Sequence, residues 1–117
     1  ELAQLIHGLD FRGCRALLLG DLVLDRFIFG TTRRVSREAP IPVVQYAGES
    51  VAPGGAANAA ANLASLGAQV SVAGLVGADE RGDELLSCLT SLGVDTRLVC
   101  ASATAASAAA SVCSLRF

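Results

Sequence analysis

The sequence contains no lysine, no methionine and no tryptophan, and its aromatic residues are limited to four phenylalanines and one tyrosine. All of its basic charge therefore comes from nine arginines, which eleven acidic residues outweigh to give a net charge of −2. Without a basic block, the chain has little with which to neutralise a nucleic-acid backbone. Nucleic acid is therefore excluded as an expected partner.

Metal-ligating patterns are also scarce. The sequence has a single histidine, His7, and four cysteines without any Cys-x-x-Cys pair, namely Cys14, Cys88, Cys100 and Cys113. This spacing argues against a zinc site. An even cysteine count permits two disulfides, but in a reducing compartment isolated cysteines are expected to act as small apolar fillers.

No apolar run approaches the roughly 18 residues of a membrane-spanning helix, and the first residues lack the basic region of a signal peptide. We therefore expect a cytoplasmic protein with no membrane partner. Its 117 residues fit one ordinary domain, and 52% hydrophobic against 17% charged residues excludes a polar disordered chain.

The hydrophobic pattern predicts an α/β fold, with a mainly parallel sheet flanked by helices. Strands are expected at 15–20, 69–74 and 96–100, and helices at 56–66 and 79–92, which Gly67 and Gly93 terminate. Between them, 27–47 carries two prolines and predicts short edge strands or a hairpin projecting from the sheet.

The two ends of the chain differ from this pattern. Residues 1–10 have apolar residues at helical spacing and predict a short amphipathic helix. Residues 101–117 are rich in alanine, serine and threonine, and are expected to be disordered or a poorly specified helix. The expected organisation is thus one α/β unit over 1–100 and a low-complexity tail over 101–117.

Acidic and glycine-rich positions supply the first candidate site residues. Asp21 and Asp25 follow the first predicted strand, where ligands of open parallel sheets bind and where a carboxylate can accept hydrogen bonds from two sugar hydroxyls. Gly54 and Gly55 precede a helix and allow a ligand close to the backbone, and Asn58 adds a donor and an acceptor. A turn or cap residue remains the alternative for each aspartate, and a plain turn for the glycine pair.

Charged clusters supply the remaining candidates. Arg33, Arg34 and Arg37 could together bind a phosphate, because guanidinium groups present paired donors, or could form a solvated loop. The acidic residues Asp79, Glu80, Asp83 and Glu84 are interpreted as the first turns of a helix, whose dipole they complement, and not as a metal site.

Taken together, these residues resemble the N-terminal part of the ribokinase-like carbohydrate kinases, the PfkB family. The resemblance covers residues 14–100, and its most specific stretches are Pro-Gly-Gly-Ala-Ala-Asn and its continuation over 53–68, followed by Gly-Leu-Val-Gly-Ala-Asp over 74–79. Residues 20–27 and 36–44 are most similar to the heptose 7-phosphate kinases, the kinase domain of ADP-heptose synthase among them.

The resemblance implies a ribokinase-like fold in which Asp25 holds sugar hydroxyls, and Gly54, Gly55 and Asn58 line the same pocket. It implies ATP and Mg²⁺ as cofactors, a sugar phosphate as substrate and a small β lid over about 27–47, through which a homodimer could form. In a heptose kinase the acceptor already bears a phosphate, which would give Arg33, Arg34 or Arg37 a role.

The resemblance is partial, because the Gly-Ala-Gly-Asp motif that carries the family's catalytic base does not occur in this chain. The sequence therefore predicts a truncated, ribokinase-like sugar-binding portion that is inactive alone and has no catalytic residue of its own. A kinase for another sugar, a non-catalytic sugar-binding or interaction module, and a gene remnant that folds poorly remain alternatives.

Overall fold

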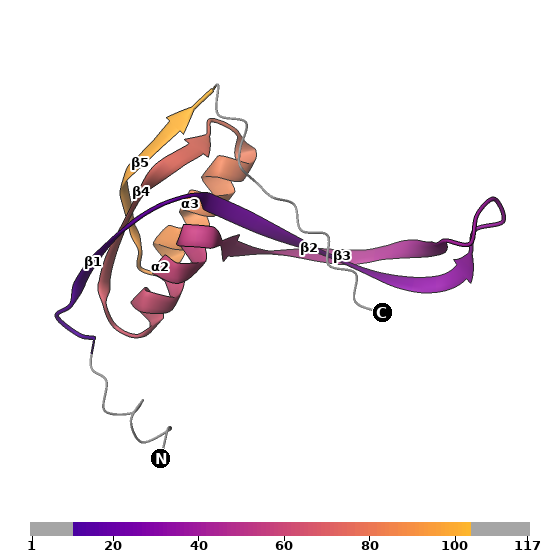
Figure 1. Ribbon diagram of the computed structural model, residues 1–117, viewed down its shortest axis with the longest axis horizontal. Helices are drawn as coiled ribbons and strands as arrows, with labels where there is room; N and C mark the ends of the chain where they lie inside the picture. The colour runs from indigo at the N-terminus through magenta and orange to yellow at the C-terminus, as the bar shows by residue number, and fades with distance from the viewer. Residues whose placement is uncertain (1–10, 104–117) are drawn as a thin grey trace, which may run out of the picture.

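The computed structural model of the protein describes residues 11–103 (Figure 1). Its elements follow in the order β1 (Arg15–Leu19), β2 (Leu22–Val35), β3 (Pro42–Gly54), α2 (Gly55–Ser65), β4 (Gln69–Gly77), α3 (Glu80–Ser91) and β5 (Asp95–Ser102). This order confirms the predicted alternation of strands and helices. The helix expected over 1–10 and the character expected for 104–117 lie outside the described residues.

The three strands β1, β4 and β5 form a parallel sheet in the order β1-β4-β5. Both crossovers step in the same direction across the sheet, so right-handed connections place α2 and α3 on one face. Figure 1 shows both helices to the right of the three strands. Along β4, Val70, Val72 and Val76 are buried against this helical layer, as expected for side chains that alternate between two faces.

Each helix has local signals that fix its ends. Asp79 caps α3 by accepting a hydrogen bond from the backbone N–H of Gly82 at 2.9 Å, and two acidic residues follow in the first turn. Gly67 and Gly93 take positive φ angles of 95° and 80° just after the two helices, which confirms them as terminators. With 11 and 12 residues, α2 and α3 are short, and no helix within 11–103 could cross a membrane.

Small residues bring the helices close to the sheet. Ala57 and Ala60 of α2 are fully buried, as is Leu89 of α3. They belong to a core of ten buried hydrophobic residues: Leu22, Leu24, Ala57, Ala60, Val70, Val72, Val76, Leu85, Leu89 and Val94. The core thus lies between the sheet and the two helices, and the start of β2 contributes to it.

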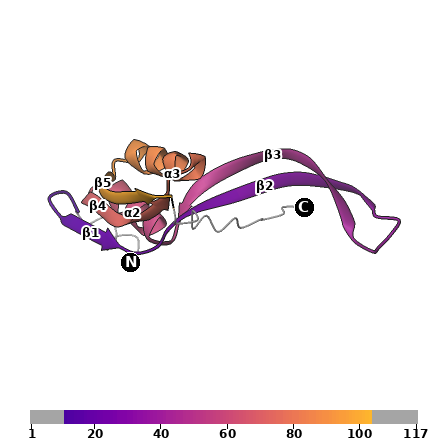
Figure 2. The same ribbon diagram turned by 90° about the horizontal axis from the view of Figure 1, so that it is seen from above.

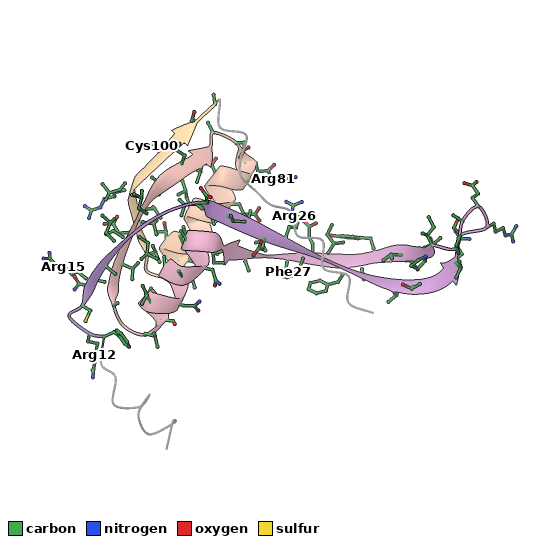
Figure 3. All side chains as sticks on the ribbon, in the orientation of Figure 1. Arg12, Arg15, Arg26, Phe27, Arg81 and Cys100 are labelled. Carbon is green, nitrogen blue, oxygen red and sulfur yellow. The ribbon has the colours of Figure 1, made fainter. Side chains whose placement is uncertain are left out.

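The opposite face of the sheet carries apolar side chains that no described residue covers. Leu17 is 63% exposed, Leu19 81%, Leu75 61% and Leu98 55%. Figure 3 shows Arg15, which shares this face of β1, pointing away from the helices. An uncovered apolar surface of this kind is typical of a binding or packing surface.

The expectation that the cysteines act as buried fillers is not met among the described residues. Cys14 and Cys100 are exposed and Cys88 is only partly buried, and all three are free. Cys14 precedes β1, and Cys100 alternates with the core-facing Val99 and therefore lies on the uncovered face. Cys100 is exposed because no residue within 11–103 forms a second layer over that face.

Strands β2 and β3 form a separate antiparallel hairpin that arches away from the sheet (Figure 2). They contain 14 and 13 residues, so the hairpin is much longer than the short edge strands expected over 27–47. The prolines fit because a two-stranded ribbon has only edge strands: Pro42 begins β3 and Pro53 is its next-to-last residue.

Replacing Leu89 by alanine tests the position of the core. Because its side chain is fully buried, Leu89→Ala is expected to lower the free energy of unfolding by about 2–5 kcal/mol. Leu98→Ala, a matched change at a half-exposed position, should cost less than about 1 kcal/mol. Urea unfolding followed by circular dichroism measures both, and equal losses would contradict the assigned layers.

Candidate functional site

The candidate site lies where the end of β1, the root of the hairpin and the start of α2 meet. The backbone N–H of Ala56 in the first turn of α2 donates to the carbonyl of Asp21 at 3.0 Å, and Leu22 forms an isolated bridge with Gly55. The chain therefore leaves β1, runs out along the hairpin and returns to within hydrogen-bond distance of its departure point. This return brings residues 21–25 and 54–58 together.

Asp25 lies inside β2, opposite Ala52, and is partly buried. Its carboxylate rests against the backbone of Gly54: a Cβ added there would lie 2.6 Å from Oδ2 of Asp25. Among residues 11–103 the carboxylate makes no hydrogen bond or ion pair. Asp25 is therefore neither a turn residue nor a helix cap, and both its oxygens remain available to accept hydrogen bonds from a ligand.

Gly55 has φ +55°, in the left-handed region that favours glycine. A Cβ there would lie 2.7 Å from the carbonyl oxygen of Asp21 and 3.3 Å from Cγ2 of Val23. Gly55 is thus required by the backbone itself, whereas a side chain at Gly54 would meet the carboxylate of Asp25. The structure explains them by the close approach of two chain segments, whether or not a ligand also uses the space.

Asn58 lies on the exposed surface of α2, one turn from its start. Its side-chain oxygen accepts a hydrogen bond from Nδ2 of Asn62 at 3.3 Å, which leaves the two N–H groups of its own amide as donors. Within the described residues, no side chain caps the α2 N-terminus and no acidic residue occupies its first turn. This end of α2 is therefore suited to an oxygen-rich ligand.

The three arginines at the far end of the hairpin do not join this cluster. The register pairs Arg34 with Val43, whereas Asp25 pairs with Ala52. Nine residues of strand separate Asp25 from Arg34, or about 30 Å at ~3.3 Å per residue. Arg34 and Arg37 line a recess of about 470 Å³ at the hairpin tip, and Arg33 belongs to the same stretch of β2.

Two further residues of the hairpin root were missed by the sequence analysis. Arg26 reaches Glu49 of β3 at 3.7 Å and Glu84 of α3 at 4.0 Å, so it links the hairpin to α3. Phe27 lies on the other side of the ribbon, as Figure 3 shows. The signal that could have found Phe27 is the alternation Asp-x-Phe-x-Phe over 25–29, which places both rings on the Asp25 face of a strand.

A polar cluster at the opposite edge of the sheet lines a recess of about 710 Å³ but is structural in character. The Arg97 guanidinium donates to both carboxylate oxygens of Asp95, at 2.9 and 2.7 Å, and holds the pKa of that carboxyl well below its usual range. Because the pKa is lowered in the folded state, the stabilisation is present at neutral pH and is lost as the pH falls below the usual carboxyl range. Solvent exposure of this pair keeps the effect small.

The described residues hold no group of three or more histidine, cysteine, aspartate or glutamate side chains that could bind a metal ion. The acidic residues at the start of α3 act as expected on its N-terminus, with Asp79 as the cap and Glu80 and Asp83 in the first turn. Glu84 instead faces Arg26. The acidic side chains at the start of α3 are thus accounted for by the helix N-terminus and by Arg26.

Comparison with protein families places these motifs in context. A family model described as pfkB family carbohydrate kinase matches residues 22–114. The match begins at β2, includes the hairpin and both glycines, and extends into the alanine-rich residues after 100.

Individual proteins agree with this match. The chain is 52% identical over 89 residues to the bifunctional protein HldE of Nitrosococcus oceani, which covers 75% of this chain and 19% of that protein. Fructokinase from Xylella fastidiosa with bound ATP is similar in structure, with a TM-score of 0.58, 26% identity, and coverage of 80% of this chain and 27% of that one. Ribokinase from Cryptococcus neoformans in complex with ADP gives a TM-score of 0.52 at 28% identity, covering 74% and 26%.

These figures also set the scale of the resemblance. The chain spans about a fifth of the length of the curated relatives that it matches and about a quarter of the solved kinases. The likeness to solved structures shows a ribokinase-like arrangement of sheet, helices and hairpin.

Replacing Gly54 by alanine tests the close approach at the site. Because the new methyl group would displace the Asp25 carboxylate, Gly54→Ala is expected to lower the free energy of unfolding by about 1–3 kcal/mol. Gly48→Ala is the matched control in the same strand, where a Cβ meets nothing within 4 Å, and should be neutral or slightly stabilising. Urea unfolding of the two variants compares them, and equal stability would contradict the contact.

Proposed function

The chain belongs to the pfkB family of carbohydrate kinases, and from this premise we propose that it is the N-terminal, sugar-binding portion of an ATP-dependent heptose 7-phosphate kinase. The enzyme phosphorylates the anomeric hydroxyl in the cytoplasm, in the biosynthesis of ADP-heptose for lipopolysaccharide. The observation that carries the proposal is the unpartnered Asp25 carboxylate held over Gly54. The 52% identity to an HldE protein favours heptose 7-phosphate over other sugars.

In this proposal the sugar lies between the Asp25 face of the hairpin root and the first turn of α2. The Asp25 carboxylate accepts hydrogen bonds from two adjacent hydroxyls, which fixes the orientation of the ring. The amide of Asn58 donates to a sugar oxygen, since its own oxygen is engaged by Asn62. Gly54 and Gly55 let the sugar approach the backbone without meeting a side chain.

These residues position the acceptor but do not transfer the phosphoryl group. Transfer from ATP needs a base for the attacking hydroxyl and electrostatic stabilisation of the transferring group. The chain lacks the Gly-Ala-Gly-Asp motif, and residues 11–103 hold no cluster of three or more His, Cys, Asp or Glu side chains. We therefore place the ATP and Mg²⁺ sites on further polypeptide, and the uncovered leucines of the sheet, with Leu17 63% and Leu75 61% exposed, give it a surface to pack on.

Supplying the missing part tests this function. A chimera in which residues 11–103 replace the equivalent segment of the Nitrosococcus oceani HldE protein is expected to convert ATP and D-glycero-D-manno-heptose 7-phosphate to ADP and the 1,7-bisphosphate. Asp25→Asn should lower kcat/KM for the sugar at least ~100-fold, because a carboxylate with two acceptor oxygens is lost. Asp83→Asn, an exposed change on α3, is the control and should leave the rate unchanged.

The other readings predict different results from the same samples. Sugar binding without turnover in the chimera would favour a non-catalytic binding module, and turnover of a different sugar would reassign the substrate. If the purified 117-residue chain shows no cooperative unfolding transition, this result would support the interpretation that the chain is a gene remnant that folds poorly.

We further propose that the hairpin is a lid through which two copies pair, and that Arg33, Arg34 and Arg37 bind the substrate phosphate of the partner copy. The ~30 Å of strand between Asp25 and Arg34 is too long for one sugar phosphate to touch both residues within a single chain. An isologous pair of hairpins would bring each tip to the site of the other copy.

Mixing two inactive variants of the chimera tests this arrangement. One variant carries Asp25→Asn with an intact tip, and the other carries Arg33→Ala, Arg34→Ala and Arg37→Ala with an intact Asp25. If the tip acts on the partner, mixed dimers contain one complete site, and random exchange should restore about a quarter of the wild-type activity. A monomer by light scattering, or no recovery in mixed dimers, would overturn the proposal.

A further inference from the structure

The root of the hairpin presents two faces of different character. On one face, Leu22 and Leu24 are buried in the core at 3% exposure, and Arg26 continues toward Glu84 of α3. On the other face, Val23 lies against Gly55 and Asp25 against Gly54. Because side chains alternate along a strand, this second face continues outward with Phe27 and Phe29.

The strand opposite keeps the second face open. The residues paired with Asp25, Phe27 and Phe29 are Ala52, Ser50 and Gly48, all of them small. No large side chain from β3 therefore covers the rings directly across the ribbon. Phe27 is partly buried, whereas Phe29 is 36% exposed. The result is a strip that begins with a carboxylate and continues as aromatic surface.

We propose that the ring of Phe27 packs against the apolar C–H face of the sugar whose hydroxyls Asp25 holds. The two residues are about 7 Å apart along the strand, close to the span of one pyranose ring. A sugar has hydroxyls at its edge and C–H groups on its face, so a carboxylate beside an aromatic ring recognises both. Binding sites commonly combine aromatic walls with a few convergent polar groups in this way.

This contact selects for substrate shape as well as for hydroxyl pattern. A six-membered ring with several C–H bonds on one face covers the phenyl ring, whereas a smaller or open-chain sugar covers less of it. Phe29 extends the same apolar strip by two residues, toward the hairpin tip. The substrate class that fits is therefore a pyranose carrying further carbon atoms outside the ring.

The inference rests on the proposed function, and its test separates the two. In the chimera, Phe27→Leu keeps an apolar side chain but loses the flat ring, and is expected to raise KM for heptose 7-phosphate about tenfold. The kcat and the KM for ATP should stay within about twofold, since the contact binds ground state and transition state alike. Phe27→Tyr retains the ring and should restore KM.

Ile28→Val is the matched control, because Ile28 is the next residue and lies on the Arg26 face of the same strand. It should leave both KM values unchanged. Unfolding curves of Phe27→Leu, Phe27→Tyr and Ile28→Val show whether a variant is destabilised. A destabilised variant would lose kcat as well as affinity for the sugar.

The absence of tryptophan from the chain allows a second measurement on the full 117 residues without turnover. Phe27→Trp introduces a single fluorophore at the proposed contact, and Ile28→Trp places one on the opposite face. Heptose 7-phosphate should shift or quench the emission of the first variant in a saturable manner, and leave the second unchanged.

The outcomes are distinct. If the chimera without further substitutions neither binds nor phosphorylates heptose 7-phosphate, the proposed function fails and the inference fails with it. If the sugar is phosphorylated but Phe27→Leu leaves KM unchanged, only the aromatic contact is overturned. If Phe27→Leu alters the dimer content in light scattering without altering KM, the ring belongs to the pairing surface of the lid and the inference is likewise overturned.

Discussion

The structure depends on one close backbone contact, where the chain returns from the hairpin and passes the point at which it left the sheet. The carbonyl of Asp21 accepts the N–H of Ala56, and only glycine at 54 and 55 leaves room for the Asp25 carboxylate and the Asp21 carbonyl. This contact holds the two ends of the long hairpin segment together. It thereby offsets the conformational entropy that is lost when these ends are brought together. It also sets Asp25 beside the start of α2, so the fold and the candidate site share one constraint.

The second organising feature is the contrast between the two faces of the sheet. Fully buried alanines in α2 let the helix approach the strands closely, and the valines of β4 fill the space between them. On the other face, leucines remain exposed on all three strands. The solved kinases that share this arrangement are roughly four times longer than the matched part, which agrees with a larger fold in which that face is covered.

The hairpin separates the candidate site residues, with Asp25 at its root and the arginines at its tip. At the root, side chains alternate between the two faces of β2. Asp25 and Phe27 lie on one face, and Arg26 lies on the other, where it contacts Glu84. The Arg26 ion pairs are partly exposed and contribute little to the stability of the fold. At the tip, the arginines are separated from the root by the length of the strands, and this separation makes a second copy relevant to the proposed phosphate contact.

The sequence by itself determined the order of strands and helices, because apolar periodicity, the Asp79 cap and the terminating glycines are local signals that tertiary contacts did not override. The family resemblance also led to the prediction that Asp25, Gly54, Gly55 and Asn58 line one sugar pocket, and the structure places Asp25 against Gly54. What it left open was decided by the tertiary structure. The hairpin grew well beyond 27–47 because two edge strands tolerate prolines, and strand length then separated the arginines from Asp25. The glycines proved necessary for a contact between segments about thirty residues apart, which a local reading of a Gly-Gly turn cannot reveal. Likewise, the alternation over 25–29 places Phe27 on the same face as Asp25, but only the structure shows that this face lies beside Gly54.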